Sequence, residues 1–185
     1  MVKRINVPLY REELNTLKAG DMVLISGTIY TARDAAHKKM IELMQMGKPL
    51  PFDIKNQVIY YAGPCPAPTG RVIGSVGPTT SGRMDKYAPA LIESGLTGMI
   101  GKGQRDENVV RAMIENGAVY FGAVGGAAAL ISKSIKSQEL IAFEELGTEA
   151  VRRLEVVDFP AIVVIDRYGD NLYDTGRKQY ARLDD

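Results

Sequence analysis

The chain has 185 residues and a mass of 20.2 kDa, with 45% hydrophobic residues and a formal net charge of +1. This length suits one soluble domain with a core of its own, and the balanced charge gives no long-range field that would attract nucleic acid or an anionic membrane. One cysteine, Cys65, and one histidine, His37, exclude a disulfide framework, a zinc finger or a metal cluster held by this chain alone. We therefore expect a single domain over residues 1–185 with no metal ligands of its own.

The first residues of this sequence do not have the pattern expected of a targeting segment. Pro8 comes early, no apolar stretch follows a basic one, and no run of about 18 apolar residues occurs in the sequence. We expect a protein of the reducing cytoplasm that does not enter a membrane.

The first half of the chain predicts alternating strands and helices. Thr31 followed by Asp34 resembles a capping box that would begin a helix, and Gly47 with Pro49 would end that helix. The expected elements are an extended start, one or two helical turns at 11–18, strands at 22–30 and 57–62, an amphipathic helix at 31–46, a proline-rich loop at 63–70 and a third strand from Val72.

The second half continues the alternation and ends in several strands. Residues 78–83 are expected to lead into a helix that ends near Ser94. The other expected elements are helices at 106–116 and 125–132, strands at 98–100, 119–124, 139–143, 153–157 and 161–166, and a turn at 168–171. Strands separated by helices predict an α/β fold, while the strand-rich last third indicates either a second sheet or antiparallel strands added to a mixed sheet.

Three segments place a cationic residue where a predicted strand ends and a helix or turn begins. A helix N-terminus stabilises an anion by roughly 0.3–1 kcal/mol, and each charge-assisted hydrogen bond from a guanidinium adds about 1.5–3 kcal/mol. An arginine in a first helical turn opposes the helix dipole, which favours a functional role for it. Arg33 and Arg83 are therefore candidates to bind a small dicarboxylate, and Lys102, between two glycines, is a further anion-contacting candidate.

A structural interpretation remains open for each of these residues. A capped helix with a surface salt bridge would explain either arginine, an exposed turn would explain Lys102, and a packed, hydrogen-bonded ring would explain His37, which lies one turn after Arg33. Cys65 lies between prolines without an activating partner, and we expect it to be structural. The glycine-rich residues 122–127 lack the dinucleotide-binding spacing, so close packing of a helix on the sheet explains them better than nucleotide binding.

Five segments, taken together, resemble one enzyme family. They read Gly-Thr-Ile-Tyr-Thr-Ala-Arg-Asp-Ala-Ala-His at 27–37, Tyr-Ala-Gly-Pro at 61–64, Gly-Pro-Thr-Thr-Ser-Gly-Arg-Met at 77–84, Lys-Gly at 102–103 and Val-Asp-Phe-Pro-Ala at 157–161. In this order they closely resemble the iron–sulfur hydro-lyases, in particular the β subunit or C-terminal domain of class I fumarase and L-tartrate dehydratase. The resemblance covers nearly the whole chain and rests on two long segments that agree together.

The resemblance implies a fold and a partner. The fold would be a three-layer, swivelling β/β/α domain with a mixed sheet, which agrees with the α/β pattern of the predicted elements. The partner, an α subunit or an N-terminal domain, would hold a [4Fe-4S] cluster through its own cysteines, and the family implies an α2β2 assembly. Because this chain has a single cysteine, composition and resemblance both place the cluster on the partner.

The resemblance also implies a reaction, the reversible removal of water from a 2-hydroxy dicarboxylate such as malate. By position in the motifs, Arg33, Arg83 and Lys102 would bind substrate carboxylate, and Thr79 would handle the proton. A threonine hydroxyl is a weak base, so Thr79 would need an acidic or imidazole partner from the α subunit. The further residues expected to line the pocket are Thr31, Asp34, His37 and Thr80.

The sequence leaves three functions open. Fumarate hydration to L-malate is the leading one, and dehydration of tartrate or hydration of a methylated, mesaconate-type substrate is the second. Such substrates differ by a hydroxyl or a methyl group, worth about 1–3 kcal/mol in a pocket. The third is a non-catalytic module that binds a dicarboxylate through the same arginines.

Overall fold

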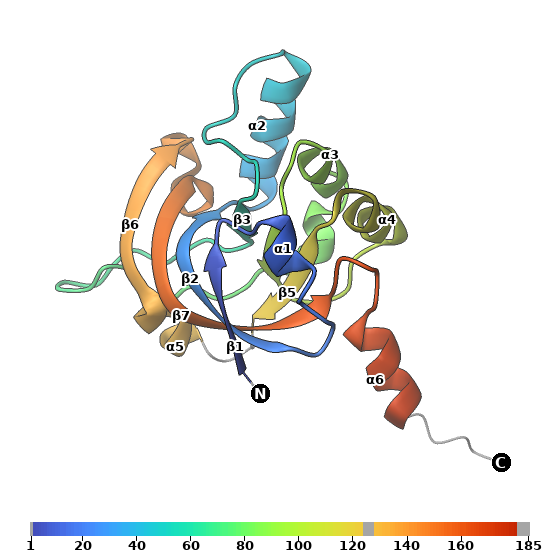
Figure 1. Ribbon diagram of the computed structural model, residues 1–185. Helices are drawn as coiled ribbons and strands as arrows, with labels where there is room; N and C mark the ends of the chain where they lie inside the picture. The colour runs from blue at the N-terminus through green and yellow to red at the C-terminus, as the bar shows by residue number, and fades with distance from the viewer. Residues whose placement is uncertain (1, 124–127, 181–185) are drawn as a thin grey trace.

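The computed structural model describes residues 2–123 and 128–180. These residues form a seven-stranded sheet with helices packed beside it (Figure 1). The strands are β1 (Val2–Val7), β2 (Met22–Thr31), β3 (Val58–Tyr60), β4 (Gly98–Gly101), β5 (Val119–Ala123), β6 (Ile135–Ala142) and β7 (Val151–Ile165). The helices are α1 (Arg11–Leu14), α2 (Asp34–Gln45), α3 (Ala88–Glu93), α4 (Glu107–Asn116), α5 (Ala128–Ser134) and α6 (Leu172–Tyr180), with 3-10 turns η1 (Ser81–Met84) and η2 (Glu144–Glu149).

The sheet contains both parallel and antiparallel pairs, and it curves so that β2 and β7 pair and close it. β1 to β5 pair in parallel, while β7 pairs antiparallel with β5, β6 and β2. Because β2 is hydrogen-bonded to β3 on one edge and to β7 on the other, β2, β3, β4, β5 and β7 form a closed ring. The long curved path of β2 and β7 is visible in Figure 1. The α/β fold with added antiparallel strands is thus confirmed.

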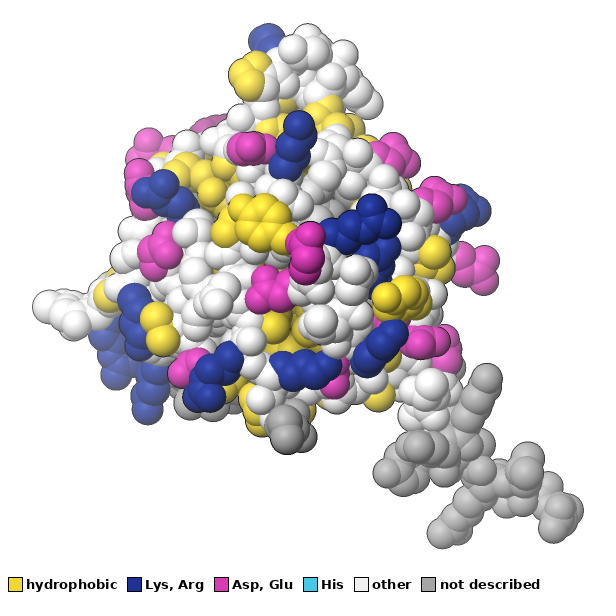
Figure 2. All heavy atoms as spheres, viewed as in Figure 1, with side chains coloured by type: hydrophobic (Ala, Val, Ile, Leu, Met, Phe, Trp, Pro, Cys, Tyr) yellow, Lys and Arg dark blue, Asp and Glu magenta, His cyan; other side chains and the backbone are white. Residues whose placement is uncertain are grey.

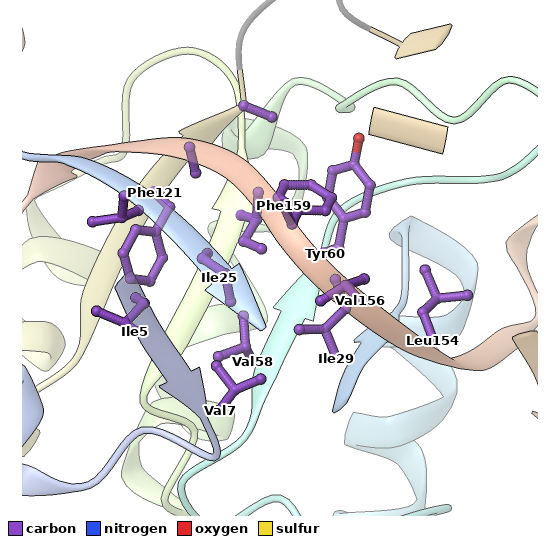
Figure 3. Close-up of a cluster of buried hydrophobic side chains, with 14 of the residues drawn as sticks. Ile5, Val7, Ile25, Ile29, Val58, Tyr60, Phe121, Leu154, Val156 and Phe159 are labelled. Carbon is purple, nitrogen blue, oxygen red and sulfur yellow. The ribbon is translucent and has the colours of Figure 1, made fainter. Parts of the chain in front are cut away.

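Two apolar layers lie on opposite faces of these strands. One fills the interior of the ring and includes Ile25, Tyr60, Phe121 and Phe159, whose side chains converge in Figure 3. The other lies between the sheet and α2, α3 and α4, which pack on one side of it in Figure 1. Burial of each large apolar side chain contributes about 1.5–3 kcal/mol to the stability of the fold. The two layers together therefore fix the positions of the strand ends.

The sequence of the central strands explains both layers. Tyr60 lies in the ring interior while its neighbour Tyr61 faces the helices, and Phe121 and Tyr120 alternate in the same way. Successive side chains of a strand point to opposite faces, so a strand covered on both faces is apolar at every position. This is why the central strands are continuous hydrophobic runs.

The helix predicted to follow residues 78–83 ends near Ser94 as expected, but the structure divides this stretch into a 3-10 turn and a separate short helix. η1 ends at Met84, and α3 begins only at Ala88. Pro89 lies in the first turn of α3, where its missing N–H is harmless, but inside a longer helix it would remove a backbone hydrogen bond.

The predicted strand from Val72 is also wrong. Residues 71–79 form no strand, although Ile73 and Val76 are buried in the ring interior as a strand's residues would be. The segment instead packs against the proline-rich loop, and a Cβ on Gly74 would lie 2.5 Å from the carbonyl oxygen of Cys65. The Cys65 side chain is exposed, so the expected structural role for it is not supported.

The strands predicted separately at 153–157 and 161–166 are one strand, β7. Asp158 has a positive φ of 52° inside it, and the register against β2 shifts nearby. The residues Asp158 and Pro160 therefore mark an irregularity within the strand rather than its end. Part of the helix expected at 125–132 is present as α5, which is described from Ala128. Residues 125–127 of that helix, and Val124 at the end of the strand predicted at 119–124, lie outside the described residues.

The surface carries mixed charge. On the face drawn in Figure 2, basic and acidic side chains are interspersed and hydrophobic side chains form separate small patches. Within residues 2–123 and 128–180, no helix has the length and apolar character needed to cross a bilayer.

Candidate active site

The carboxyl ends of neighbouring parallel strands bring the predicted cationic segments together. β3 lies between β2 and β4 in the sheet. Thr79 donates its backbone N–H to the carbonyl of Tyr61 after β3 at 2.6 Å, and Thr80 forms a parallel β-bridge with Lys102 after β4. The segment at 77–83 therefore lies along the ends of β3 and β4, the end of a parallel sheet at which ligands commonly bind.

Arg33 lies directly before α2, as its N-cap residue. Its Nη2 is 3.1 Å from Oε1 of Glu149, and the two side chains are about one quarter exposed (24% and 23%). Gly63 makes room for the guanidinium, because a Cβ there would lie 2.8 Å from Arg33 Nη1. The Nε of Arg33 is buried and has no partner within the described part of the chain. Glu149 thus orients the guanidinium of Arg33, and the Nε–H of Arg33 remains available as a hydrogen-bond donor.

Arg83, in η1, is oriented by Asp34. Its Nε donates to Oδ1 of Asp34 at 2.8 Å, and the Arg83 side chain is 51% exposed. An ion pair this exposed contributes only about 0–1 kcal/mol, so its effect is to orient the guanidinium rather than to stabilise the fold. The capping box predicted from Thr31 and Asp34 is wrong, because α2 has no side-chain cap and the Asp34 carboxylate contacts Arg83 instead.

Thr79 and Lys102 provide the unpaired polar groups of the site. Thr79 is half-buried and Lys102 is exposed, and within the described residues neither Oγ1 of Thr79 nor Nζ of Lys102 has a hydrogen-bond or ion-pair partner. Gly103 follows with a positive φ of 84°, which turns the chain sharply after the lysine. Within the described residues, a hydroxyl and an ammonium without partners thus lie on the edge of the sheet that also carries the two paired arginines.

Three predicted pocket residues remain, of which Thr80 is exposed and Thr31 and His37 are buried. Thr80 is exposed beside Lys102, where it can line a site. Thr31 is fully buried, and its Oγ1 accepts a hydrogen bond from the backbone N–H of Arg152 at 3.2 Å, so it supports the pairing of β2 with β7.

His37 lies behind the site and is fully buried. Its Nδ1 lies 2.9 Å from the carbonyl oxygen of Arg33, which makes Nδ1 the protonated nitrogen, and its Nε2 has no partner among the described residues. The ring packs edge-on against Tyr61, with the centroids 5.2 Å apart. Burial lowers the pKa of His37 to about 4, so the packed, hydrogen-bonded interpretation describes this histidine.

The buried imidazole predicts a pH dependence of stability. The unfolded chain binds a proton at His37 near pH 6.5 and the folded chain only near pH 4, so the free energy of unfolding falls as pH drops through that window. Between pH 7 and pH 5 the loss should be about 2 kcal/mol. Urea unfolding at both pH values measures it, and the His37→Gln variant should lack this part of the slope. An NMR titration of the sole histidine that gives a pKa near 6.5 would contradict the assignment.

Several residues that hold the candidate site in place were not predicted from the sequence. Glu149 holds Arg33 from a distant turn, and no local pattern indicated it. Arg105 directly precedes Asp106, the N-cap of α4, so a search for arginines near the start of a helix, as with Arg33, would also have found it. Tyr61 and Tyr120 each place a hydroxyl in an apolar run, and a buried phenol normally requires a hydrogen-bond partner. The two tyrosines in apolar strands were therefore the feature of the sequence that could have indicated a polar network beneath the site.

The described residues offer no metal site. No group of three or more His, Cys, Asp or Glu side chains among them is placed to hold an ion, and the single cysteine, Cys65, is exposed and unpaired. The donors present therefore do not fit an iron–sulfur cluster, which needs several thiolates.

Known proteins similar to this chain share one family. A family model described as the fumarase C-terminus matches residues 1–176. The chain is 44% identical over 165 residues to fumarate hydratase 2 of Leishmania major, and the match covers 88% of this chain and 29% of that protein. It is 42% identical over 163 residues to the anaerobic class I fumarate hydratase of Escherichia coli K12, covering 87% and 30% of the two chains.

A third relative has nearly the same length as this chain. It is a Methanocaldococcus jannaschii protein named provisionally as L(+)-tartrate dehydratase subunit beta, 39% identical over 184 residues, with 96% of this chain and 94% of that protein covered. The chain thus spans about 30% of the two fumarate hydratases and almost all of the archaeal subunit. Since the family match extends over residues 1–176, the chain belongs to the fumarase C-terminus family, as the resemblance of its motifs predicted.

Proposed function

We propose that this chain is the β component of a two-part hydro-lyase that reversibly hydrates fumarate to L-malate. The observation that carries the proposal is that Arg33, Arg83 and Lys102 lie on segments at the carboxyl ends of β2, β3 and β4. Thr79 lies on one of these segments, and its hydroxyl has no partner among the described residues. Two carboxylates are well matched by two guanidinium groups and an ammonium, and guanidinium binds carboxylate in a bidentate manner.

Each cation would have a defined part in this reaction. Arg83 uses Nε for Asp34 and presents the rest of its guanidinium to solvent, which suits recognition of a substrate carboxylate. Arg33 and Lys102 would hold the second carboxylate and fix the substrate between the two ends. Held in this way, the carbon that gives up a proton in the dehydration direction would lie against Thr79.

Thr79 would carry the proton. In the dehydration direction a carbon–hydrogen bond would break, its proton would pass to the deprotonated Oγ1 of Thr79, and its electron pair would form the carbon–carbon double bond. The C–O bond at the neighbouring carbon would break, and the leaving hydroxide would become water by taking a proton from the partner's general base. Because a neutral hydroxyl is a poor base, a carboxylate or imidazole of the partner would first have to accept the hydroxyl proton of Thr79. The buried His37, with its pKa lowered to about 4 and its Nδ1 hydrogen-bonded to Arg33, is poorly suited to that task.

The exposure of the candidate site to solvent supports the proposal that a partner covers it. Lys102 and Thr80 are exposed, and half of the Arg83 side chain (51%) is accessible to solvent. Electrostatic stabilisation is strongest where water is excluded, so a competent site needs a covering surface. We place the [4Fe-4S] cluster on that covering partner, because the donors of this chain do not fit one, and we expect an α2β2 assembly in the cytoplasm. The three-layer, swivelling description of the domain belongs to the same proposal.

The name of the archaeal relative favours an alternative substrate. That relative is covered over 94% of its length, whereas the fumarate hydratases are covered over 29% and 30%. L(+)-Tartrate dehydration, or hydration of a mesaconate-type substrate, is therefore the second candidate, and a non-catalytic dicarboxylate-binding module is the third.

A substrate panel distinguishes these candidates. The chain is combined anaerobically with the cluster-bearing α chain from the same source, and kcat/KM is measured for fumarate, L-malate, L-tartrate and mesaconate. We expect fumarate and L-malate to give the highest values, by at least about tenfold, because an extra hydroxyl or methyl group is worth about 1–3 kcal/mol in a pocket. Turnover of tartrate alone would select the second candidate. No turnover of any substrate, with an intact cluster, would leave the binding module.

A further inference from the structure

A buried polar network lies directly beneath the candidate site, and the proposed function does not yet use it. Its centre is Arg105, whose side chain is fully buried and whose Nε donates to Oδ1 of Asp85 at 2.7 Å. Oδ2 of Asp85 accepts the backbone N–H of Asp106 at 2.9 Å. Asp85 directly follows η1, so this ion pair ties the turn that carries Arg83 to the start of α4.

Arg105 also reaches the strand end that supports Thr79. Its Nη1 donates to the hydroxyl of Tyr61 at 3.2 Å, and its guanidinium lies 5.2 Å from the centre of the Tyr61 ring. The carbonyl of Tyr61 in turn accepts the backbone N–H of Thr79 at 2.6 Å. Movement of Tyr61 would therefore move Thr79.

A second aromatic residue connects the network to Lys102. The Arg105 guanidinium lies 5.2 Å from the centre of the Tyr120 ring. The Tyr120 hydroxyl donates to the carbonyl of Gly103 at 2.9 Å and is 2.8 Å from Oγ of Ser81. The backbone N–H of Ser81 donates to the carbonyl of Lys102 at 2.8 Å. The backbone at Lys102 and Gly103 is thus held by Ser81 and by Tyr120, and Tyr120 packs on Arg105.

The energetics of this arrangement argue for a role beyond stability. Removing two charges from water is costly, and apolar residues of similar size often replace a buried ion pair without loss of stability. Burial alone would lower the pKa of Arg105, but Tyr61 and Asp85 outweigh that effect and raise it, so the guanidinium stays charged. Its Nη2 has no partner within the described residues. What the pair does provide is a fixed geometry for several directional hydrogen bonds.

We propose that Arg105 is a positioning residue that holds the segments carrying Thr79 and Lys102 in the arrangement needed for substrate. Its effect on catalysis rests on the proposed function, but its effect on the geometry of the two segments does not. Arg105 touches neither Thr79 nor Lys102, and it acts through Tyr61, Asp85 and Tyr120.

Amide hydrogen exchange tests the geometric part. Exchange is followed in the free chain and in the complex for peptides covering residues 79–83 and 101–104, with α2 as the internal reference. Arg105→Met should speed exchange in both segments at least tenfold relative to α2, and Arg105→Lys should do so less. Leu91→Ala, which opens a cavity in the same helix–sheet layer without touching the network, should leave that ratio unchanged. An unchanged ratio in Arg105→Met, or an equal change in Leu91→Ala, would overturn the proposal.

Kinetics of the complex test the functional part. Arg105→Met should raise KM and lower kcat, giving a loss of at least tenfold in kcat/KM, and the loss should shrink in a Lys102→Ala background because both changes affect the same lysine. Losses that multiply would show that Arg105 acts independently of Lys102, against the proposal. If the wild-type complex turns over none of the dicarboxylates, the proposed function fails, and the exchange experiment still decides the role of Arg105.

Discussion

Replacing Arg83 with methionine is expected to lower kcat/KM of the assembled enzyme by about 100-fold to 10,000-fold. A guanidinium that binds a carboxylate in a bidentate manner makes two charge-assisted hydrogen bonds of about 1.5–3 kcal/mol each, and methionine retains the length of the side chain without the charge. The fold should be unaffected, because Arg83 is half exposed (51%) and its pair with Asp34 contributes little stability. Steady-state kinetics with fumarate measures the first effect, and thermal unfolding the second.

Arg111→Met is the matched control for this variant. Arg111 is an exposed arginine of α4 whose Nη2 contacts only Asn108 in the described structure. Its replacement should leave kcat/KM within about twofold, since surface changes away from a site seldom exceed about 0.5 kcal/mol. If both variants lose activity equally, or if neither does, Arg83 does not bind substrate.

Replacing Gly101 with alanine is expected to destabilise the domain by at least about 3 kcal/mol, at the upper end of the cost of overpacking. A Cβ at this position would lie 2.0 Å from Oγ of Ser81 and 3.0 Å from Cδ2 of Tyr61. The serine hydroxyl cannot turn away without losing its hydrogen bond to Tyr120, and β4 is held between two neighbouring strands. For a domain of this size the melting temperature should fall by about 6–12 °C.

Two further variants make this prediction specific. Gly77→Ala introduces a methyl group whose nearest neighbour, Cβ of Ala128, would be 3.7 Å away, so its melting temperature should change by less than about 2 °C. Ser81→Ala in the Gly101→Ala background removes the closest clashing atom and should recover part of the loss. A Gly101→Ala variant as stable as the wild type would show that the ends of β4 and η1 are not packed as described.

Local patterns predicted the elements whose ends are marked by specific residues. The helix at 106–116 is confirmed as α4, with Asp106 as its N-cap and Gly117 in the left-handed conformation after it. The strand at 98–100 is confirmed as β4, and the turn at 168–171 leads back to a bridge between Ile165 and Asn171. These features depend on short-range hydrogen bonds, so a few neighbouring residues determine them.

The failures arose where distant parts of the chain compete with the local pattern. Thr31 and Asp34 fit a capping box, but the β7 backbone and Arg83 engage their side chains instead. α6 was not predicted at all, since the chain was expected only to turn back after the last strand. The closure of the sheet depends on the pairing of β2 with β7, about 130 residues later in the chain, which no local pattern indicates.

The candidate site was more predictable than the fold around it. Arg33 and Lys102 follow the ends of β2 and β4, which the parallel order of β2, β3 and β4 brings to one edge. Arg83 follows a predicted strand that does not form, and it reaches the same edge because Thr79 and Thr80 pair with Tyr61 and Lys102.

Asp34 was predicted as a pocket residue, but its pairing with Arg83, the role of Glu149 and the network around Arg105 were not. The members of these contacts are separated by up to 116 residues, as between Arg33 and Glu149, and meet only in the folded chain.

Titration of the cluster-bearing α chain with this chain under anaerobic conditions, with fumarate followed by its ultraviolet absorbance, tests the proposed division of the active site most directly. Because we propose that the cations and the hydroxyl of this chain act together with a cluster on the partner, we expect no hydration by either chain alone and activity that saturates at equal molar amounts. Full activity of the α chain alone would contradict the account, because it would show that Arg33, Arg83, Lys102 and Thr79 are not needed for the reaction.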